Sequence, residues 1–421
     1  MKNSSDQKIS RVVLAACVLF NVSIGVLYAW SVISSRLTAP EYDGGWGWSS
    51  SQAGLPYTVA IIVFATAMLI GGRLQDKIGP RRVVTVGGAL SGLGVMLSGL
   101  VGNSVIGITL CFGVIAAIGM GFGYGCVTPP ALKWFHPSKK GLISGLIVGG
   151  FGLSAVYYAP LTSMLLDNFG IGSTLLYLGI GILVVSVFFA RLIKNPPTGY
   201  VPDTPAKLKQ KAAKTLPTVD YTFKQMLKTR RFYMMFLMFV LASSVGLMII
   251  GNISRIAQNQ IGITDATVLA MLVSFLAVTN TVGRVIGGMM SDKIGRINSL
   301  YVLLVLYAVN MGAFMLYNSL PMLIIGIIGI GFCFGTLLSV FPALTADQYG
   351  LKNFGANYGI MFMAWGLSGV VAPVIANYLY DINGNFYTAY IICAVMMVAM
   401  IFVNYLVQKD IAKADSKARG M

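Results

Sequence analysis

Charged residues are scarce in this sequence. They make up 10% of its 421 residues, and only 13 residues are acidic, whereas a typical soluble domain carries roughly 25% charged residues. Hydrophobic residues account for 56%. A soluble domain has no interior large enough for so much apolar surface, so the composition excludes an ordinary soluble protein and favours a membrane protein.

The sequence also lacks the residues of metal and catalytic sites. It has one histidine, His136, and no Cys-x-x-Cys pair, so no metal site of histidine and cysteine ligands can be assembled. It contains no Gly-x-x-x-x-Gly-Lys-Ser/Thr phosphate loop, no paired carboxylates and no nucleophile beside a base. We therefore expect no cofactor, and neither an enzyme nor an ATP-driven pump. His136 lies in a basic loop, where we expect a solvated or lipid-facing side chain.

The cysteines lie far apart, each within an apolar stretch: Cys17, Cys111, Cys126, Cys333 and Cys393. We expect small buried side chains rather than a disulfide framework. Leu14 to Cys17 also resembles a lipoprotein cleavage box after a short basic start. Cleavage there would leave an incomplete first apolar stretch, so an uncleaved N-terminus is the favoured interpretation.

Long apolar stretches recur along the whole chain. They cover residues 11–35, 52–72, 82–102, 105–130, 142–166, 171–193, 232–254, 266–290, 299–318, 321–345, 355–379 and 385–407. A helix of roughly 20 residues crosses a hydrocarbon core about 30 Å thick. The sequence therefore predicts an all-α membrane protein with twelve transmembrane helices and with both termini on the same side of the membrane.

The formal charge of +17 raises the alternative of a nucleic-acid-binding protein. All but three of the 30 lysines and arginines, however, fall at the termini or in segments on the same side of the twelve predicted helices. The exceptions are Arg36, Arg255 and Arg284. By the positive-inside rule this side is the cytoplasm, so the surplus charge specifies topology and no nucleic-acid partner is expected.

One polar segment divides the chain. Residues 194–231 are rich in lysine and proline, too polar to cross a membrane or to form a core. We predict a six-helix bundle over residues 1–193, a cytoplasmic linker over 194–231, a second six-helix bundle over 232–407 and a cytoplasmic tail over 408–421. Within the linker, Phe223 to Leu227 could form a short amphipathic helix, although a plain solvated linker is the favoured interpretation.

The two halves share a loop signature, in which a glycine is followed four residues later by an aspartate, then by a second glycine and an arginine. Its residues are Gly72, Asp76, Gly79 and Arg81 in the first half and Gly288, Asp292, Gly295 and Arg296 in the second. A Pro-Ala-Leu sequence recurs at nearly the same offset, at residues 130–132 and 342–344. Internal repeats of this kind are typical of transporter folds.

This signature resembles the cytoplasmic loop motif of the major facilitator superfamily. The resemblance implies two pseudo-symmetric six-helix bundles and a secondary transporter that works by alternating access. It also implies a conformational gating role for Gly72, Asp76, Arg81, Gly288, Asp292 and Arg296. The glycines would let helices approach, and each aspartate could lie at the N-terminus of a neighbouring helix, where the dipole favours an anion.

Arg284 is the only charged residue in the interior of a predicted span, since every other charged residue lies in a loop or at the end of a span. It lies eight residues before Asp292, hence roughly 12 Å further into the membrane. A structural interpretation is that Arg284 snorkels or binds carbonyl groups. The functional interpretation is that it binds an anion, because guanidinium offers a planar fork matched to a carboxylate. Asn280 lies one turn away on the same face.

Tyr124 lies at a similar depth in the fourth span, among Gly119, Gly121, Gly123 and Gly125. Glycines in a membrane helix more often serve helix packing. A tyrosine hydroxyl in an apolar wall needs a partner, however, and a substrate oxygen would serve.

Further motifs resemble the monocarboxylate transporter and oxalate/formate antiporter branch of the superfamily. They are Leu27 to Ser31, Tyr124, Lys133 to Gly141, Asn280 with Arg284, and Asn357 to Gly359. In that branch the arginine binds the substrate carboxylate, and aromatic or aliphatic residues enclose its carbon skeleton. Carried over by position, the resemblance implies substrate-binding roles for Arg284, Asn280, Tyr124, Leu27, Tyr28, Phe334, Phe362 and Trp365.

Two departures from the branch narrow the expectation. Trp365 occupies the position at which the oxalate carriers have a second buried cation, a lysine. One cation suits one carboxylate, so the expected substrate is a small monoanion such as lactate or pyruvate. Asn280 replaces an aspartate that is associated with proton coupling in animal relatives, which weakens the expectation of proton symport.

The expectation is thus a monomeric, proton-coupled carrier in the bilayer of a bacterial cell inner membrane. An anion exchanger and a non-transporting membrane sensor or scaffold are the alternatives.

Overall fold

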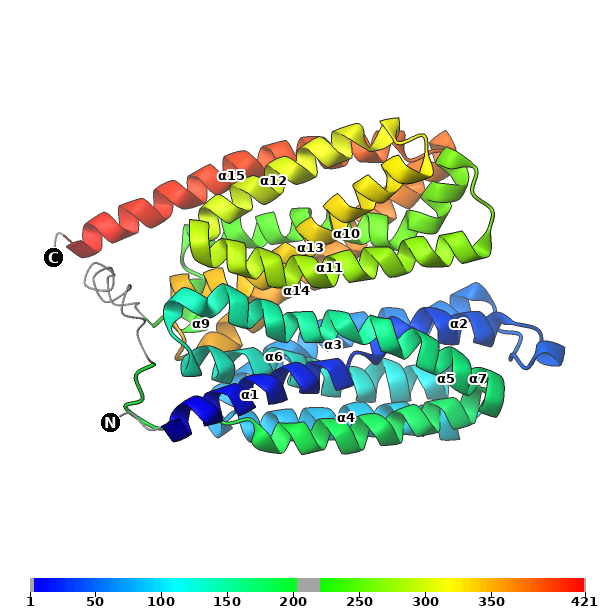
Figure 1. Ribbon diagram of the computed structural model, residues 1–421, viewed down its shortest axis with the longest axis horizontal. Helices are drawn as coiled ribbons and strands as arrows, with labels where there is room; N and C mark the ends of the chain where they lie inside the picture. Colours follow the sequence, from blue (N-terminus) through cyan, green and yellow to red (C-terminus); the bar gives the residue numbers. More distant parts are fainter. Residues whose placement is uncertain (1–3, 203–219, 420–421) are drawn as a thin grey trace. The chain divides into compact units, whose positions relative to one another are not determined.

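The computed structural model describes residues 4–202 and 220–419, and all of its regular structure is helical (Figure 1). The first part of the chain forms α1 (Ser4–Ser23), η1 (Val26–Ala29), α2 (Trp30–Thr38), η2 (Glu41–Asp43), α3 (Ser50–Ile78), α4 (Pro80–Leu100), α5 (Val105–Ile108), η3 (Thr109–Ala116), α6 (Ala117–Trp134), η4 (Pro137–Lys139) and α7 (Lys140–Leu192). The second part forms α9 (Phe223–Met226), α10 (Arg230–Ile261), α11 (Ala266–Ile294), α12 (Arg296–Ala313), η6 (Phe314–Leu316), α13 (Leu320–Tyr349), α14 (Phe354–Asn383) and α15 (Tyr387–Arg419).

The helices account for the predicted membrane crossings. Ten helical segments of the described residues are long and apolar enough to cross a membrane. One of them, Pro137–Leu192, has 56 residues and breaks at Gly170, whose φ of 72° is not helical, so it has room for two crossings. The apolar α14, with 30 residues, supplies the remaining one. The predicted all-α fold with twelve transmembrane helices is confirmed.

The second glycine of each loop signature separates one helix from the next. Gly79 separates α3 from α4 with a φ of 88°, and Gly295 separates α11 from α12 with a φ of 89°. These backbone conformations are accessible to glycine and rare for other residues. Pro80 then occupies the first turn of α4, where its missing N–H leaves no hydrogen bond unmade.

The first predicted span is broken, which the sequence analysis did not anticipate. α1 ends at Ser23, and the chain passes through Gly25 before η1 begins. Hydroxyl groups of α7 donate hydrogen bonds to the carbonyl oxygens near the break: Ser154 to Gly25 at 3.2 Å, Tyr157 to Val22 at 2.9 Å and Tyr158 to Ser23 at 2.6 Å. A break at membrane depth is tolerated because these side chains satisfy the carbonyls.

The linker contains a short helix, so the favoured interpretation of a plain solvated linker is wrong in part. α9 begins with a capping box in which Thr222 and Gln225 bond reciprocally to each other's backbone N–H groups. Met226 is fully buried, and its burial anchors this helix to the protein. Residues 203–219 of the linker lie outside the described residues.

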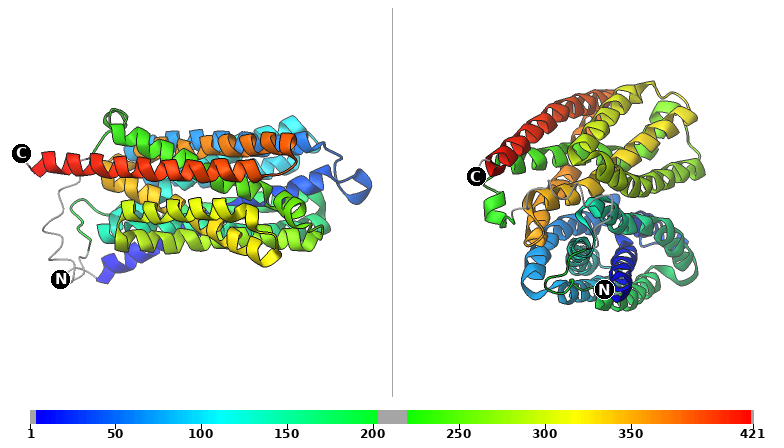
Figure 2. Two further views of the ribbon diagram at one scale, coloured as in Figure 1. Left: turned by 90° about the horizontal axis from the view of Figure 1, so that it is seen from above. Right: turned by 60° about the vertical axis from the view of Figure 1, so that its left-hand side comes forward.

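The described residues divide into two compact units that do not coincide with halves of the sequence. Unit 1 comprises residues up to 135 with 150–201 and 353–363, and unit 2 comprises residues 136–149, 202–352 and 364 onward. Within each unit the long helices run side by side (Figures 1 and 2). The start of α7 thus contacts α11, α12 and α13, and the start of α14 contacts α3 and α6. The predicted bundle boundaries remain a prediction.

The glycine-rich part of α6 is a packing surface. A methyl group added at Gly119 would lie 2.2 Å from the backbone nitrogen of Ser91, and one at Gly121 would lie 2.5 Å from the carbonyl oxygen of Phe64. These distances are too short for any side chain, so α3 and α4 approach α6 at backbone contact distance. The packing interpretation of these glycines is correct, and Tyr124 lies in the part of α6 that α3 and α4 approach closely.

The break in α7 can be tested by substitution. Gly170 has φ 72° and ψ 177°, a conformation that other residues adopt only under strain. We expect Gly170→Ala to lower the free energy of unfolding by about 1–3 kcal/mol, measured as a lower midpoint of thermal unfolding in detergent. The matched control is Gly181→Ala in the same helix. At both sites an added methyl group meets no atom within 4 Å, so equal midpoints for the two variants would contradict this account of the break.

Candidate functional site

Arg284 lies on α11 in unit 2 and is almost completely buried, with 1% of its surface exposed. Its Nε donates to Oδ1 of Asn280, one turn earlier, at 3.1 Å. Its Nη1 donates to the carbonyl oxygen of Val148 on α7 at 2.6 Å. Both acceptors are uncharged, so neither of these two bonds neutralises the charge of the guanidinium.

Small residues on two neighbouring helices determine where this turn of α11 lies. A methyl group added at Gly145 of α7 would lie 2.2 Å from the carbonyl oxygen of Arg284. One added at Gly335 of α13 would lie 2.0 Å from the carbonyl oxygen of Asn280. Both helices therefore contact the α11 backbone directly at this turn. The close approach of α7 is what brings the Val148 carbonyl within reach of the guanidinium.

The two interpretations of Arg284 both find a counterpart in this geometry. The structural interpretation expects a carbonyl partner, and Val148 provides one. The functional interpretation expects a buried cation that can exchange a weak acceptor for a carboxylate. A carboxylate carries a full negative charge and accepts from two guanidinium N–H groups at once, whereas a carbonyl oxygen is neutral, so an entering carboxylate would compete well against the carbonyl.

Tyr124 belongs to an aromatic cluster in unit 1. Its ring centroid lies 5.5 Å from that of Phe362, 5.5 Å from Phe64 and 5.0 Å from Phe151. Phe151 also packs edge-on against Tyr28 at 5.5 Å. The predicted residues Tyr124, Phe362 and Tyr28 are thus joined by direct or shared ring contacts, and they form an apolar wall with tyrosine hydroxyls in it.

The sequence analysis missed Phe64 and Phe151, which complete this cluster. Phe64 comes from α3 and Phe151 from α7, and both are buried. A phenylalanine in an apolar span carries no chemical signal, since most such residues serve only packing. Only the fold shows that these two contact Tyr124.

The other predicted residues are distributed between the units. Leu27 is buried on η1 in unit 1. Phe334 of α13 is buried in unit 2, where it packs so closely on α10 that a methyl group at Gly246 would lie 2.3 Å from its ring. Trp365 of α14 is half-buried, and its carbonyl accepts a hydrogen bond from Ser368 at 2.5 Å. Unit 1 therefore holds Leu27, Tyr28, Tyr124 and Phe362, and unit 2 holds Asn280, Arg284, Phe334 and Trp365.

The loop-signature aspartate of unit 2 lies at the N-terminus of a helix. Its two carboxylate oxygens accept hydrogen bonds from the backbone N–H groups of Gly141 and Leu142 in the first turn of α7, each at 2.8 Å. Arg296 Nη1 pairs with Asp292 Oδ1 at 2.6 Å. The carboxylate is thus stabilised by the positive end of the α7 dipole and by a guanidinium.

Two further charged residues extend this contact, and the sequence analysis had not assigned them a role. Asp347, near the end of α13, pairs with Lys140 at 2.7 Å and with Arg296 at 3.0 Å. Lys140 and Arg296 are both nearly buried. In the sequence, Asp347 follows the repeated Pro-Ala-Leu at the end of its span, which marks it as part of the repeat. An aspartate at the end of a helix is usually solvated, however, so its position alone predicts no ion pair.

Unit 1 contains a counterpart of this contact. Asp76 Oδ2 accepts a hydrogen bond from the backbone N–H of Ala356, in the first turn of α14, at 3.1 Å. A methyl group at Gly72 would lie 2.0 Å from the Gly355 carbonyl, just as one at Gly288 would lie 2.2 Å from the Gly141 carbonyl. Each signature glycine therefore allows a helix N-terminus to reach the signature aspartate.

The arginines do not follow the repeat. Arg81 is exposed, and its side chain makes no hydrogen bond or ion pair with another described residue. Arg296 in contrast bonds to Ser291, Asp292 and Asp347. The two signature contacts share the geometry of the glycine and the aspartate, but the signature arginine bonds to the aspartate only in unit 2.

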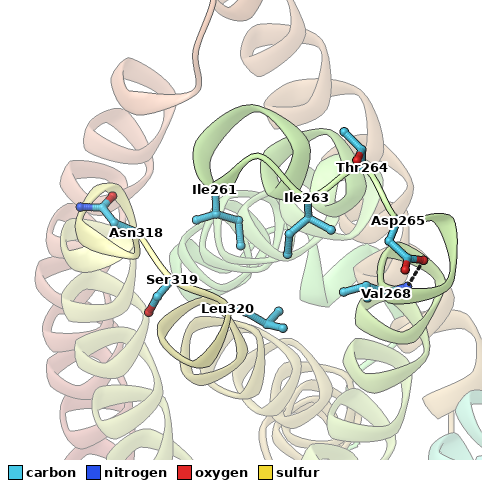
Figure 3. A pocket seen from close by; sticks show the side chains of 8 residues that line it. All are labelled: Ile261, Ile263, Thr264, Asp265, Val268, Asn318, Ser319 and Leu320. Carbon is cyan, nitrogen blue, oxygen red and sulfur yellow. Dashed lines mark hydrogen bonds between the residues drawn. The ribbon is translucent and has the colours of Figure 1, made fainter.

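A pocket of about 380 Å³ lies elsewhere in unit 2 (Figure 3). It is lined by Ile261, Ile263, Thr264, Asp265, Val268, Asn318, Ser319 and Leu320. Asp265 accepts a hydrogen bond from the backbone N–H of Val268 at 3.3 Å, which caps the start of α11. Val268 precedes Arg284 by sixteen residues on α11, hence roughly 24 Å. This pocket includes none of the predicted site residues.

His136 has a local structural role. It is half-buried, and its Nδ1 lies 2.9 Å from the Ser138 hydroxyl and accepts from the Ser138 backbone N–H, which caps η4. Burial, together with the charge of Lys139, lowers the pKa of the imidazole. No group of three or more His, Cys, Asp or Glu side chains in residues 4–202 and 220–419 is placed to hold a metal ion.

The fold and these contacts define a class, that of membrane transporters built from repeated helical halves. The chain belongs to the Major Facilitator Superfamily, whose sequence profile matches residues 14–318 and, in a second match, residues 269–420. It is a multi-pass membrane transporter and not an enzyme.

Individual relatives cover most of the chain. It is 29% identical over 358 residues to the oxalate:formate antiporter of Oxalobacter formigenes, covering 84% of this chain and 80% of that protein. It is 24% identical over 397 residues to monocarboxylate transporter 13 of Rattus norvegicus, covering 92% and 86%. The crystal structure of the human organic anion transporter MFSD10 matches with a TM-score of 0.73 at 13% identity over 96% of this chain and 100% of that one, which supports the fold alone.

The unit 2 contact makes a prediction about stability. Asp292 and Arg296 have side chains that are each 10% exposed, whereas the Arg36–Asp167 pair is 28% and 57% exposed. Asp292→Asn removes one of the two carboxylates that pair with Arg296 and the charged acceptor at the N-terminus of α7, so we expect it to cost about 3 kcal/mol. Asp167→Asn, the matched control, should cost less than about 1 kcal/mol. Thermal unfolding midpoints in detergent measure both, and similar shifts would contradict a buried, stabilising contact.

Proposed function

We propose that this protein carries a small monocarboxylate, of the size of lactate or pyruvate, across a bacterial inner membrane by alternating access. It acts as a monomer with both termini in the cytoplasm and couples transport to protons. The observation that supports this most is that Arg284 is buried and donates hydrogen bonds to two uncharged acceptors, Asn280 and the Val148 carbonyl. A buried cation in a transporter's spans is a functional residue by default.

The charge of the site sets the charge of the substrate. A carboxylate that replaces the Val148 carbonyl gives Arg284 a charge-assisted, two-pronged partner. Trp365 contributes no second cation, and a second carboxylate would have to lose its hydration without a fixed counter-charge, at several kcal/mol. The resemblance to the monocarboxylate transporter branch assigns the aromatic residues around Tyr124, in unit 1, to the enclosure of a short carbon skeleton.

Alternating access would use the two signature contacts. Asp76 at the start of α14 and Asp292 at the start of α7 each bind a helix N-terminus through backbone N–H groups. Such a contact is strong when made and leaves few groups buried when broken, because both partners can be hydrated at a membrane surface. Gly72, Arg81, Gly288 and Arg296 would then act with the aspartates as gating residues.

Proton coupling needs a carrier for the proton. Asn280 has no ionisable group, so in this proposal the proton travels on the substrate carboxylate itself or by way of a hydroxyl such as that of Tyr124. The neutral Asn280, together with the likeness to an oxalate:formate antiporter, favours anion exchange as the second candidate. Uptake into proteoliposomes under an inward proton gradient at zero membrane potential distinguishes the two. Symport requires that the proton gradient stimulates uptake. Exchange requires a carboxylate inside the vesicle and is insensitive to the gradient.

The central prediction concerns Arg284. We expect Arg284→Gln to reduce uptake of labelled lactate or pyruvate into proteoliposomes to background, because the substrate carboxylate loses its counter-charge. Arg284→Lys keeps the charge but loses the planar fork, and we expect it to raise KM about tenfold or more, equivalent to about 1.4 kcal/mol. Reconstituted protein amounts and thermal midpoints are measured in parallel.

The matched control is Arg36→Gln, which removes an arginine of the exposed pair with Asp167. It should leave uptake within about twofold of wild type. Wild-type uptake by Arg284→Gln would exclude the site. Failure of the wild-type protein to move or bind any short carboxylate would instead favour a membrane sensor or scaffold.

A second prediction concerns substrate charge. We expect lactate, pyruvate and formate to compete with labelled substrate, and oxalate to compete at least tenfold more weakly. Trp365→Lys adds a cation at the position where the resemblance places one, and it should improve oxalate competition relative to lactate. Trp365→Leu controls for the loss of the indole ring. Equal competition by oxalate and lactate in the wild type would exclude selection by charge.

A further inference from the structure

We propose that unit 2 carries a binding site for the headgroup of an anionic glycerophospholipid, between the first turn of α10 and the last turns of α15. A cavity of about 200 Å³ opens there, lined by Arg230, Met234, Leu406, Lys409, Asp410 and Lys413. α10 and α15 pack against each other, and the last turns of α15 project past the neighbouring helices of the unit (Figure 2). The proposal does not depend on the identity of the transported substrate.

The cavity lies at the level of the membrane where lipid headgroups are found. The apolar stretch of α10 begins at residue 232, and that of α15 ends at residue 407. Arg230, Lys409 and Lys413 stand just outside these limits, and Met234 and Leu406 stand just inside them. One wall of the cavity is therefore cationic and the other is apolar, which matches the junction of a phosphate group with its acyl chains.

The charge of the cavity favours an anion. Three cations and one carboxylate give a formal net charge of +2. In the described part of the chain, no hydrogen bond or ion pair joins Asp410 to Arg230, Lys409 or Lys413. The cations are thus not neutralised by direct pairing within the cavity. A phosphodiester would supply the missing negative charge through charge-assisted hydrogen bonds.

Neighbouring aromatic residues support the lipid over a soluble phosphate. Lys409 Nζ lies 4.6 Å from the centroid of the Tyr405 ring, a cation–π contact that holds the ammonium group at the headgroup level. Phe402, one turn further into the membrane on α15, is 62% exposed, and Tyr233 at the start of α10 is 58% exposed. Exposed apolar rings below a cationic cavity provide a path for acyl chains, which a soluble anion would not use.

The test is native mass spectrometry of the purified full-length protein, titrated with phosphatidylglycerol or with phosphatidylcholine of the same acyl chains. We expect wild type to bind phosphatidylglycerol preferentially. The triple variant Arg230→Gln, Lys409→Gln, Lys413→Gln should bind it at least tenfold more weakly, because each basic residue at an anionic membrane surface is worth about fivefold in affinity. The control triple variant Lys8→Gln, Lys224→Gln, Lys228→Gln removes the same charge from exposed positions outside the cavity and should bind as wild type does.

Two further measurements separate the outcomes. The charge-conserving variant Lys409→Arg, Lys413→Arg should retain binding, which shows that the triple variant fails by loss of charge and not by misfolding. Leu406→Asn should weaken the binding of phosphatidylglycerol without affecting the binding of inorganic phosphate. Equal loss in both triple variants, equal binding of the two lipids, or inorganic phosphate that competes at the affinity of the lipid would each overturn the proposal.

Discussion

A guanidinium group cannot enter an apolar helix bundle unless oxygen atoms replace its water, and the arrangement around Arg284 follows from that constraint. The oxygens come from Asn280 on the same helix and from the backbone of α7. A backbone carbonyl can reach the guanidinium only if the helices approach closely, so Gly145 and Gly335 are needed where α7 and α13 touch α11. The glycines, the close helix contacts and the buried charge thus depend on one another. Enlarging either glycine would move the carbonyl as well as the helix.

The signature contacts solve a different electrostatic problem with the same elements. The first N–H groups of a helix have no partner within the helix, and a carboxylate that accepts from them gains both hydrogen bonds and the favourable end of the dipole. Asp76 and Asp292 both do this. Only the unit 2 contact is reinforced by Arg296, Asp347 and Lys140. The repeat is therefore symmetric in backbone geometry, but the charged side chains around the aspartate differ: Arg296 pairs with Asp292 in unit 2, whereas in unit 1 the charge of Lys133 acts on Asp76.

Sequence reasoning succeeded where one physical signal dominates. Hydropathy located every apolar crossing, because insertion in a bilayer depends on long apolar runs. Arg284 stood out because a charged residue in the interior of a span is rare. The repeated glycine and aspartate indicated the two helix contacts. It failed where a feature depends on a partner from a distant part of the chain. The break at Gly25 is stable because hydroxyls of α7 satisfy its carbonyls, Phe151 matters because it touches Tyr124, and Asp347 matters because Lys140 reaches it. None of these partners is near in sequence.

The basic residues show why a count of charges cannot assign their roles. Lys140, Arg296, Lys409 and Lys413 satisfy the positive-inside rule equally well. Lys140 and Arg296 are nearly buried against carboxylates, so their charge is used to hold helices together. Lys409 and Lys413 are exposed beside an apolar wall and form no pair with Asp410 in the described residues, so their charge is directed to the membrane surface. What separates the two roles is whether a carboxylate lies within reach, which only the fold shows, and the position of each residue relative to the apolar stretches, which the sequence shows.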